Sequence, residues 1–274
     1  MTGKLIVITG LDGSGKTVQT DRLFSRLKSD GYSVEKVDFP QYGKGFFAKL
    51  IACYLNGDFN PNIKELLCNS SGLGKLEDLK PSVAGNDNQP LKIGPKAINP
   101  YLTSLLYAGD RWECREKILN WLEEGKIIIS NRYTCCNKAY QGAKIDDVKE
   151  RGKFFNWVDE LEHEVYKIPV PDLTIFLKND LDITVDLVKK RPQREYHYPG
   201  ADSGNKPITR NEKRVDIHEE DLEYLKLVQN TYLELVPNET GWEVIECVKD
   251  GRLDTVDKIA SRVSNVVRSI IDKL

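Results

Sequence analysis

Residues 10–17 read Gly-Leu-Asp-Gly-Ser-Gly-Lys-Thr and match the pattern G-x-x-x-x-G-K-[ST]. The stretch follows an apolar run at 5–9 and opens a helical pattern that continues to about residue 29. Glycines let such a loop curl so that its backbone N–H groups and the helix N-terminus face phosphates, while the lysine reaches the β and γ phosphates and the threonine hydroxyl holds Mg²⁺. The stretch therefore predicts a nucleoside triphosphate site made of Gly10, Gly13, Ser14, Gly15, Lys16 and Thr17, with Thr17 as the metal-binding residue.

The rest of the chain alternates strand and helix patterns. Short β-branched runs at 5–9, 33–39, 126–130, 173–177 and 242–248 are typical of buried strands. A helix is expected to begin at Pro100 after the N-cap Asn99 and to stop at Gly125, and the last helix places Ile259, Val263 and Val267 on one face. The expected fold is α/β: a three-layer P-loop NTPase fold with a five-stranded parallel sheet flanked by helices.

Composition sets further limits. The 274 residues carry 40 Lys and Arg against 42 Asp and Glu, a formal net charge of −2, so no overall field favours nucleic acid or a membrane surface. No apolar run is long enough for a bilayer span, and the six cysteines show no metal-binding spacing, so a cytoplasmic protein with reduced thiols is expected. We expect a single domain, 1–274, with a surface insertion at 58–98 and a second long excursion at 191–216.

The phosphate loop does not define the reaction. A GTPase would carry an N-K-x-D motif, which does not occur here, and motor or transporter ATPases need more domains. A small-molecule kinase remains, and such an enzyme needs a second anion site and a mobile lid, because phosphoryl transfer is catalysed mainly by positioning and charge stabilisation.

Several further motifs resemble those of the thymidylate kinase (dTMP kinase) family. They are "FPQYG" at 39–43, "NGDF" at 56–59, "NPYLTSLLYAGDRWE" at 99–113, "NRYTCCNKAYQGAK" at 131–144, "PVPDLTIFL" at 169–177 and "DIHEEDLEYL" at 216–225. Together with the phosphate loop they cover most of the chain outside 58–98 and 195–215. The resemblance implies transfer of the ATP γ-phosphoryl group to dTMP with Mg²⁺, giving dTDP for dTTP synthesis, and a homodimer.

Two residues of the 99–125 helix are candidates for binding the base. Tyr107 and Arg111 are spaced i, i+4 and so share one helix face. The resemblance implies that Tyr107 stacks on thymine and that Arg111 faces a thymine carbonyl. From spacing alone, a core tyrosine and a surface ion pair of Arg111 with a neighbouring carboxylate are the favoured alternative, and the resemblance reverses that preference.

The remaining acceptor residues surround the end of the third predicted strand. Arg132 lies at the carboxyl edge of the sheet, where ligands of open α/β folds bind, and the resemblance assigns it the monophosphate. The resemblance further implies that Asn137 reads the pyrimidine edge, using both its donor and its acceptor, and that Tyr140 crowds the sugar 2′ position. It also implies supporting roles, with Gln141 assisting, Phe39 in the pocket wall and Asp12 orienting the acceptor sugar as a catalytic residue.

The excursion at 191–216 is the candidate lid. Some family members place an arginine within the phosphate loop, but residues 11–14 here supply none. The resemblance then implies that lid arginines stabilise the transferring group, and Arg191 and Arg194 are the catalytic candidates. Further candidates are Arg210, Arg214 and the acid Glu219, and a solvated charge run is the alternative.

Asn131 departs from the family pattern, which has aspartate before the arginine. Asparagine keeps an acceptor oxygen of the same shape but loses the negative charge that would hold Mg²⁺-bound water. The loss is expected to weaken the metal site without abolishing it. Two alternatives stay open: the same fold acting on another acceptor, such as dUMP or a deoxypurine monophosphate, or a catalytically silent nucleotide-binding protein.

Overall fold

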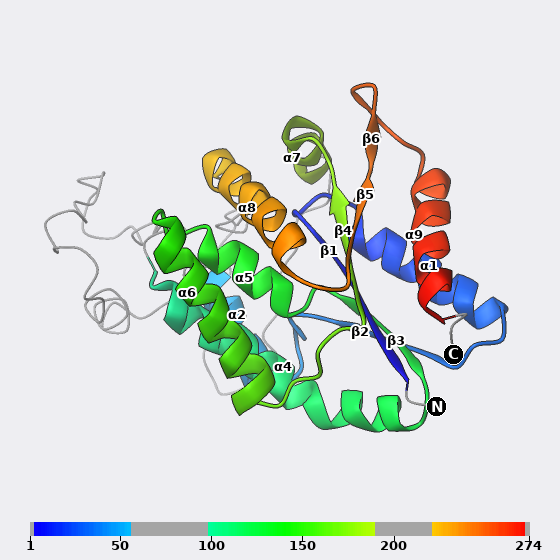
Figure 1. Cartoon of the computed structure of the whole chain (residues 1–274), viewed down its shortest axis with the longest axis horizontal. Helices are drawn as coiled ribbons and strands as arrows, with labels where there is room; N and C mark the ends of the chain where they lie inside the picture. The colour runs from blue at the N-terminus through cyan, green and yellow to red at the C-terminus, as the bar shows by residue number, and fades with distance from the viewer. Residues whose placement is uncertain (1–2, 56–97, 190–220, 272–274) are drawn as a thin grey trace, which may run out of the picture.

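A parallel sheet forms the centre of the protein, for which the computed structural model describes residues 3–55, 98–189 and 221–271. Its strands are β1 (Lys4–Gly10), β2 (Val34–Asp38), β3 (Ile127–Asn131), β4 (Leu173–Lys178) and β5 (Trp242–Glu246). They form one five-stranded sheet in the order β2-β3-β1-β4-β5, and every neighbouring pair is parallel. The expected α/β fold with a five-stranded parallel sheet is confirmed (Figure 1).

The last predicted strand is shorter than expected. The run 242–248 leaves the sheet after Glu246, and Val248–Lys249 forms β6, which pairs antiparallel with β7 (Arg252–Leu253). Asp250 and Gly251 join these strands with φ of 51° and 69°, the backbone of a two-residue hairpin turn that favours the Asp-Gly sequence. The expectation of one strand to residue 248 is therefore wrong, because Val248 pairs with Leu253 of this hairpin and not with the sheet.

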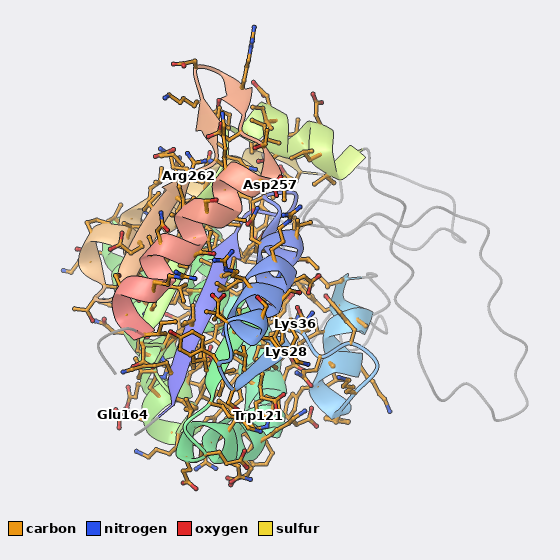
Figure 2. All side chains as sticks on the ribbon, turned by 90° about the vertical axis from the view of Figure 1, so that its right-hand side faces the viewer. Lys28, Lys36, Trp121, Glu164, Asp257 and Arg262 are labelled. Atoms are coloured by element: carbon orange, nitrogen blue, oxygen red, sulfur yellow. The ribbon has the colours of Figure 1, made fainter. Side chains whose placement is uncertain are left out.

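Helices cover both faces of the sheet (Figure 1). Side chains of β1 alternate, so Ile6 and Ile8 pack with α1 (Lys16–Ser29) and α9 (Val256–Ile271), whereas Leu5 and Val7 face the layer of α4 (Pro100–Glu123). Figure 2 shows α1 and α9 side by side on the first face, with Asp257 and Arg262 labelled on α9. The buried row of α9 includes Ile259, Val263 and Val267, as its spacing predicts.

The second layer carries the candidate acceptor residues. Helix α5 (Thr134–Gly142) packs on α4, α8 (Leu222–Leu235) packs on α5, and α2 (Phe46–Leu55) packs on α4. The chain also forms α6 (Val148–Asp159), the π-helix η3 (Glu160–Val165), α7 (Leu181–Lys189) and the short 3-10 helix η4 (Val236–Asn238). Within the described ranges, no helix has the length and apolar character needed to cross a membrane.

Both ends of α4 follow their sequence signals. The Asn99 side chain accepts a hydrogen bond from the backbone N of Tyr101 at 2.9 Å, and Pro100 occupies the first turn. At the other end Gly125 has φ 76°, and the backbone N–H groups of Gly125 and Lys126 donate to the carbonyls of Leu122 and Trp121. These contacts form the left-handed termination typical of glycine and confirm the predicted boundaries.

Two predicted excursions lie outside the described residues. The insertion 58–98 does so except for Ile98, which is buried against α2. The predicted lid 191–216 does so entirely, together with Arg191, Arg194, Arg210, Arg214 and the nearby Glu219. Their roles stay predictions.

Candidate active site

The phosphate loop connects β1 to α1 at the carboxyl edge of the sheet. Gly15 is the N-cap of α1 with φ 85°, and Gly13 has φ 94°, a region that L side chains rarely adopt. A Cβ added at Gly13 would lie 2.6 Å from the carbonyl oxygen of Thr184 on α7. Glycine is therefore required at this position by both conformation and space, and α7 packs directly against the loop.

Lys16 lies folded over this loop. Its Nζ donates to the carbonyl oxygens of Gly10 at 3.0 Å and Leu11 at 2.7 Å, and it lies 3.6 Å from the Asp12 carboxylate. The side chain is buried. A phosphate oxygen can replace these two carbonyl oxygens. It carries a negative charge and therefore makes a stronger hydrogen bond with the Lys16 ammonium group.

Asp12 joins the phosphate loop to the candidate acceptor residues. One carboxylate oxygen accepts from Arg132 Nη2, and the other accepts from the Tyr140 hydroxyl at 3.0 Å. The same hydroxyl accepts from the Asp12 backbone N at 3.2 Å. Asp12 is buried, so Lys16, Arg132 and Tyr140 all meet one carboxylate in a place with little water.

The backbone of Arg132 is held in an unusual conformation. Its φ is 65°, which is uncommon for a residue with a side chain. The neighbouring contacts enforce this geometry, because its N donates to the Ile8 carbonyl at 3.0 Å and the Ser130 hydroxyl donates to its carbonyl at 2.6 Å. Strained residues of this kind cluster at functional sites, which supports a ligand-binding role for Arg132 at the end of β3.

Asn131 contacts the predicted metal-binding residue. Its Nδ2 donates to Thr17 Oγ1 at 3.3 Å, while its Oδ1 is buried and has no hydrogen-bond partner within the described part of the chain. The Thr17 hydroxyl and the Asn131 amide both supply oxygen atoms. Mg²⁺ prefers oxygen ligands and keeps several waters, so the two oxygens suit it. No group of three or more His, Cys, Asp or Glu side chains among residues 3–55, 98–189 and 221–271 is arranged to hold a metal. These two residues therefore fit a Mg²⁺ ion that is held mainly by phosphates and water.

Arg111 is fully buried in an ion pair. Its Nε donates to Glu162 Oε2 at 2.5 Å and its Nη2 to Glu162 Oε1 at 2.6 Å. Burial opposes the charge of Arg111, but the charge and hydrogen bonds of Glu162 more than offset this and raise the pKa of Arg111. The alternative of a surface ion pair with a nearby carboxylate is wrong, because the pair is buried and its partner stands 51 residues away in the chain.

Asn137 and Tyr107 lie on facing helices of the same region. Asn137 Nδ2 donates to the Ser104 carbonyl at 3.1 Å and to Glu162 Oε1 at 2.9 Å, whereas its Oδ1 is buried and unpartnered within the described residues. The expectation that Asn137 offers both a donor and an acceptor to the base is thus wrong for the donor, which is already used. Tyr107, half-buried on α4, meets the ring of Tyr54 edge-on with centroids 6.4 Å apart.

The other predicted pocket residues are buried nearby. Gln141 is 1% exposed, and neither atom of its amide has a hydrogen-bond partner within the described residues. Phe39 meets the ring of Tyr133 with centroids 5.7 Å apart. The structure therefore groups the described acceptor candidates on α4 and α5 and in the loops that follow β1, β2 and β3.

Two buried acids of this region were not expected from the sequence. Glu162 lies in a stretch with several other acids, which gave it no distinguishing signal. Asp110 accepts from the backbone N of Gln41 at 3.2 and 3.0 Å and so fixes the "FPQYG" loop. Burial raises the pKa of Asp110 to about 6. In the sequence Asp110 stands beside the charged residues Arg111 and Glu113, so nothing distinguished it as buried.

Cys136 also makes contacts that its sequence position does not reveal. Its Sγ lies 3.1 Å from Thr9 Oγ1 and accepts from the Tyr232 hydroxyl at 3.2 Å. Burial opposes ionisation, but the hydrogen bonds of Cys135, Thr9 and Tyr232 and the charge of Arg132 lower the pKa of Cys136 well below its usual value. The described cysteines, Cys114, Cys135, Cys136 and Cys247, form no disulfide.

Comparisons with known proteins agree with this geometry. The family model described as thymidylate kinase matches residues 82–199. A thymidylate kinase of Mycobacterium tuberculosis is 26% identical over 252 residues, covering 91% of this chain and 94% of the relative. A probable thymidylate kinase of Pyrococcus horikoshii is 30% identical over 195 residues, covering 70% and 72%. The fold is similar to that of Candida albicans thymidylate kinase, with a TM-score of 0.62 at 21% identity over 98% of this chain and 92% of that one.

Proposed function

Because this chain belongs to the thymidylate kinase family, we propose that it transfers the γ-phosphoryl group of ATP to dTMP with the residues gathered around Asp12. The products are ADP and dTDP. The observation that carries this proposal is the buried Asp12 carboxylate, which contacts Arg132 and lies 3.6 Å from Lys16. One carboxylate thereby connects the phosphate loop, which suits ATP, to the arginine that suits a monophosphate.

The donor nucleotide is bound by the phosphate loop. The N–H groups of residues 13–17 and the N-terminus of α1 face the phosphates, and Lys16 leaves the carbonyls of Gly10 and Leu11 for the β and γ phosphates. This exchange of partners is favoured because a phosphate oxygen carries a negative charge and a carbonyl oxygen does not. Lys16 then stabilises negative charge on the transferring group.

The acceptor is bound on the other side of Asp12. Arg132 binds the dTMP phosphate through its fork of donors, and Tyr107 stacks on the base. Asp12 holds Arg132 and Tyr140 in place and orients the acceptor sugar. Fixed positions of this kind account for much of the catalysis in phosphoryl transfer, since little covalent chemistry falls to the protein.

Mg²⁺ is the ion that the site suits. Thr17 Oγ1 would bind it directly, and Asn131 Oδ1 would hold one of its waters. The ion supplies neutralisation of the charge on the β and γ phosphates. Asn131 provides an oxygen without a negative charge, so we expect a weaker ion site than a carboxylate would give.

The lid arginines complete the proposal. Arg191 and Arg194 follow the end of α7 by two and five residues, and α7 packs against Gly13 of the phosphate loop. The end of α7 therefore lies beside the phosphate loop. Lid closure would bring the two arginines to the transferring group and exclude water. The homodimer stays a prediction of the family resemblance, and the cytoplasmic location stays a prediction from the apolar runs of the sequence.

A coupled ADP-release assay with dTMP, dUMP, dGMP, AMP and CMP tests the acceptor. We expect dTMP to give the highest kcat/KM of the panel. Preference for dUMP or a deoxypurine monophosphate would support an altered acceptor, which the family relatives do not favour. Tight binding of ATP and dTMP by calorimetry with no turnover would instead identify a silent binder.

A further inference from the structure

The carboxylate of Glu162 connects the two side chains that the site offers to the base. It accepts Arg111 Nε and Nη2 at 2.5 and 2.6 Å, and its Oε1 also accepts Asn137 Nδ2 at 2.9 Å. Glu162 is 0% exposed and Arg111 is 2% exposed, so water does not compete for these bonds. The Glu162 carboxylate is fully buried and accepts hydrogen bonds from both Arg111 and Asn137. We therefore ask what it contributes to ligand binding.

The contacts fix which way the Asn137 amide faces. An amide nitrogen carries two hydrogens, and both are used, one by Glu162 Oε1 and one by the Ser104 carbonyl. Both partners are acceptors only. Turning the amide over would place its oxygen against these two acceptors, so the observed orientation is strongly preferred.

The oxygen of the same amide has no such partner. Asn137 Oδ1 is buried and makes no hydrogen bond within the described residues. A buried acceptor without a partner is costly, so a ligand that donates a hydrogen bond here is favoured over one that cannot. The preferred ligand therefore presents an N–H group at this point.

The ring nitrogen N3 separates the pyrimidines on this criterion. Thymine and uracil carry a hydrogen on N3, whereas neutral cytosine has an unprotonated N3 that only accepts. Cytosine would place one acceptor against another at Asn137 Oδ1. Repulsion of this kind, rather than attraction alone, is an efficient source of specificity.

We propose that Glu162 is a positioning residue that holds the Asn137 oxygen toward the acceptor base and so makes the site select pyrimidines with a hydrogen on N3 over cytosine. The inference rests on the proposed function only for the location of the base beside Asn137. Glu162 acts through Asn137 and Arg111 and does not contact the reacting atoms.

Two substitutions of Glu162 separate this role from simple support of Arg111. Glu162→Gln removes the charge but keeps an oxygen that can accept from Asn137. Glu162→Met removes every acceptor from the side chain while keeping a similar length. Both variants weaken the hold on Arg111, so the difference between them reports mainly on the Asn137 amide.

The measurement is the ratio of dissociation constants for dCMP and dUMP, obtained by calorimetry with the full chain. We expect the wild type to bind dUMP at least about 100-fold more tightly than dCMP, since a site built to pair a donor rejects analogues without it. Glu162→Gln should keep this ratio within about threefold, and Glu162→Met should lower it about tenfold or more, because only the Ser104 carbonyl then opposes turning of the Asn137 amide. KM for ATP should change in neither variant.

Three results would overturn the inference. The wild type could bind dCMP and dUMP equally, or Glu162→Met could keep the wild-type ratio of their dissociation constants. The ratio could also fall equally in both variants, which would assign the effect to Arg111. Binding needs no turnover, so a protein that discriminates these nucleotides without phosphorylating dTMP would refute the proposed function alone. If Glu162→Met does not fold, hydrogen exchange of the Asn137 side-chain amide decides. Slow exchange of both hydrogens, in the free wild-type protein and with dUMP, supports the fixed orientation of the Asn137 amide. Fast exchange overturns it.

Discussion

The two ends of the site hold their charged groups in different ways. At the phosphate end, Lys16 donates to the carbonyls of Gly10 and Leu11, which phosphate oxygens can replace. At the base end, Arg111 is held by two short hydrogen bonds to Glu162, a carboxylate with no exposed surface. The phosphate end is thus ready to change partners during the reaction, whereas the base end is fixed before a ligand arrives.

The substitution with the largest expected effect removes the charge of Lys16 at the phosphate end. Lys16→Met should lower kcat about 10³-fold, because the variant loses a cation that stabilises the transferring group. KM for dTMP should change by less than about threefold, since Lys16 does not serve the acceptor base. Steady-state kinetics provide the measurement, with Lys153→Met, an exposed lysine on α6, as the matched control. Equal loss in the control would show that the effect is not local.

A second test concerns a buried acid of α4 beside the base end. The pKa of Asp110 is raised by burial to about 6 from a usual 3.8. The folded state therefore binds this proton more tightly than the unfolded state. The proton adds its whole contribution to the free energy of unfolding below pH 3.8, and this contribution is lost as the pH rises to about 6. A rise of this size is worth about 3 kcal/mol.

Asp110→Asn removes that titration while keeping an oxygen for the Gln41 backbone. Between pH 4 and pH 7, the wild type should lose about 2 kcal/mol of unfolding free energy relative to the variant, because part of the effect is already lost at pH 4. Urea unfolding at a series of pH values measures this difference, and Asp21→Asn, an exposed acid on α1, is the control. Parallel pH curves for wild type and Asp110→Asn would mean that the carboxyl group is not buried as described.

The link between the two ends can be broken at Asp12. Asp12→Asn keeps the shape but removes the charge that Arg132 and Lys16 share, so kcat should fall about 100-fold through misplacement of both cations. The ratio of dUMP to dCMP binding should remain, because Glu162 and Asn137 are untouched. A loss of that ratio would show that the two ends are not separate. Asp257→Asn on α9 serves as the control.

The smallest effect is expected at Asn131. Asn131→Asp restores a negative charge beside Thr17 and should lower the Mg²⁺ concentration for half-maximal rate about tenfold, in line with changes to groups that support metal ligands. A Mg²⁺ titration of the rate at saturating ATP and dTMP measures it. An unchanged titration would mean that the neutral amide never weakened the site. Binding of dUMP and dCMP should not respond to the substitution.

The features that the sequence predicts are mostly local. The phosphate loop, the sheet strands and the ends of α4 each follow from residues within one short segment, such as Asn99 and Gly125. Their physical causes, hydrogen-bonded caps and backbone conformation, act over a few residues. The Asp-Gly turn at 250–251 is also local, and its signal lies in the sequence although the strand at 242–248 was expected to continue through Cys247.

The base end could not be predicted in the same way. Glu162 meets Arg111 and Asn137 only because the chain returns from α6 to α4 and α5, and several other acids stand around it in the sequence. Which amide hydrogens of Asn137 are already used depends on atoms far away in the chain. The family resemblance identified Asn137 and Arg111 as candidates, but the orientation of their polar atoms required the folded structure.

The wide turn that carries Glu162 also limits how this enzyme can vary. The π-helix η3 (Glu160–Val165) accommodates more residues per turn than the α-helix it continues. A shift of Glu162 by one position along a helix would rotate its carboxylate by about 100° around the helix axis, so its bonds to Arg111 and Asn137 depend on this winding. A change of register here would therefore break contacts to both base-end residues while leaving every predicted substrate-contacting residue in the sequence.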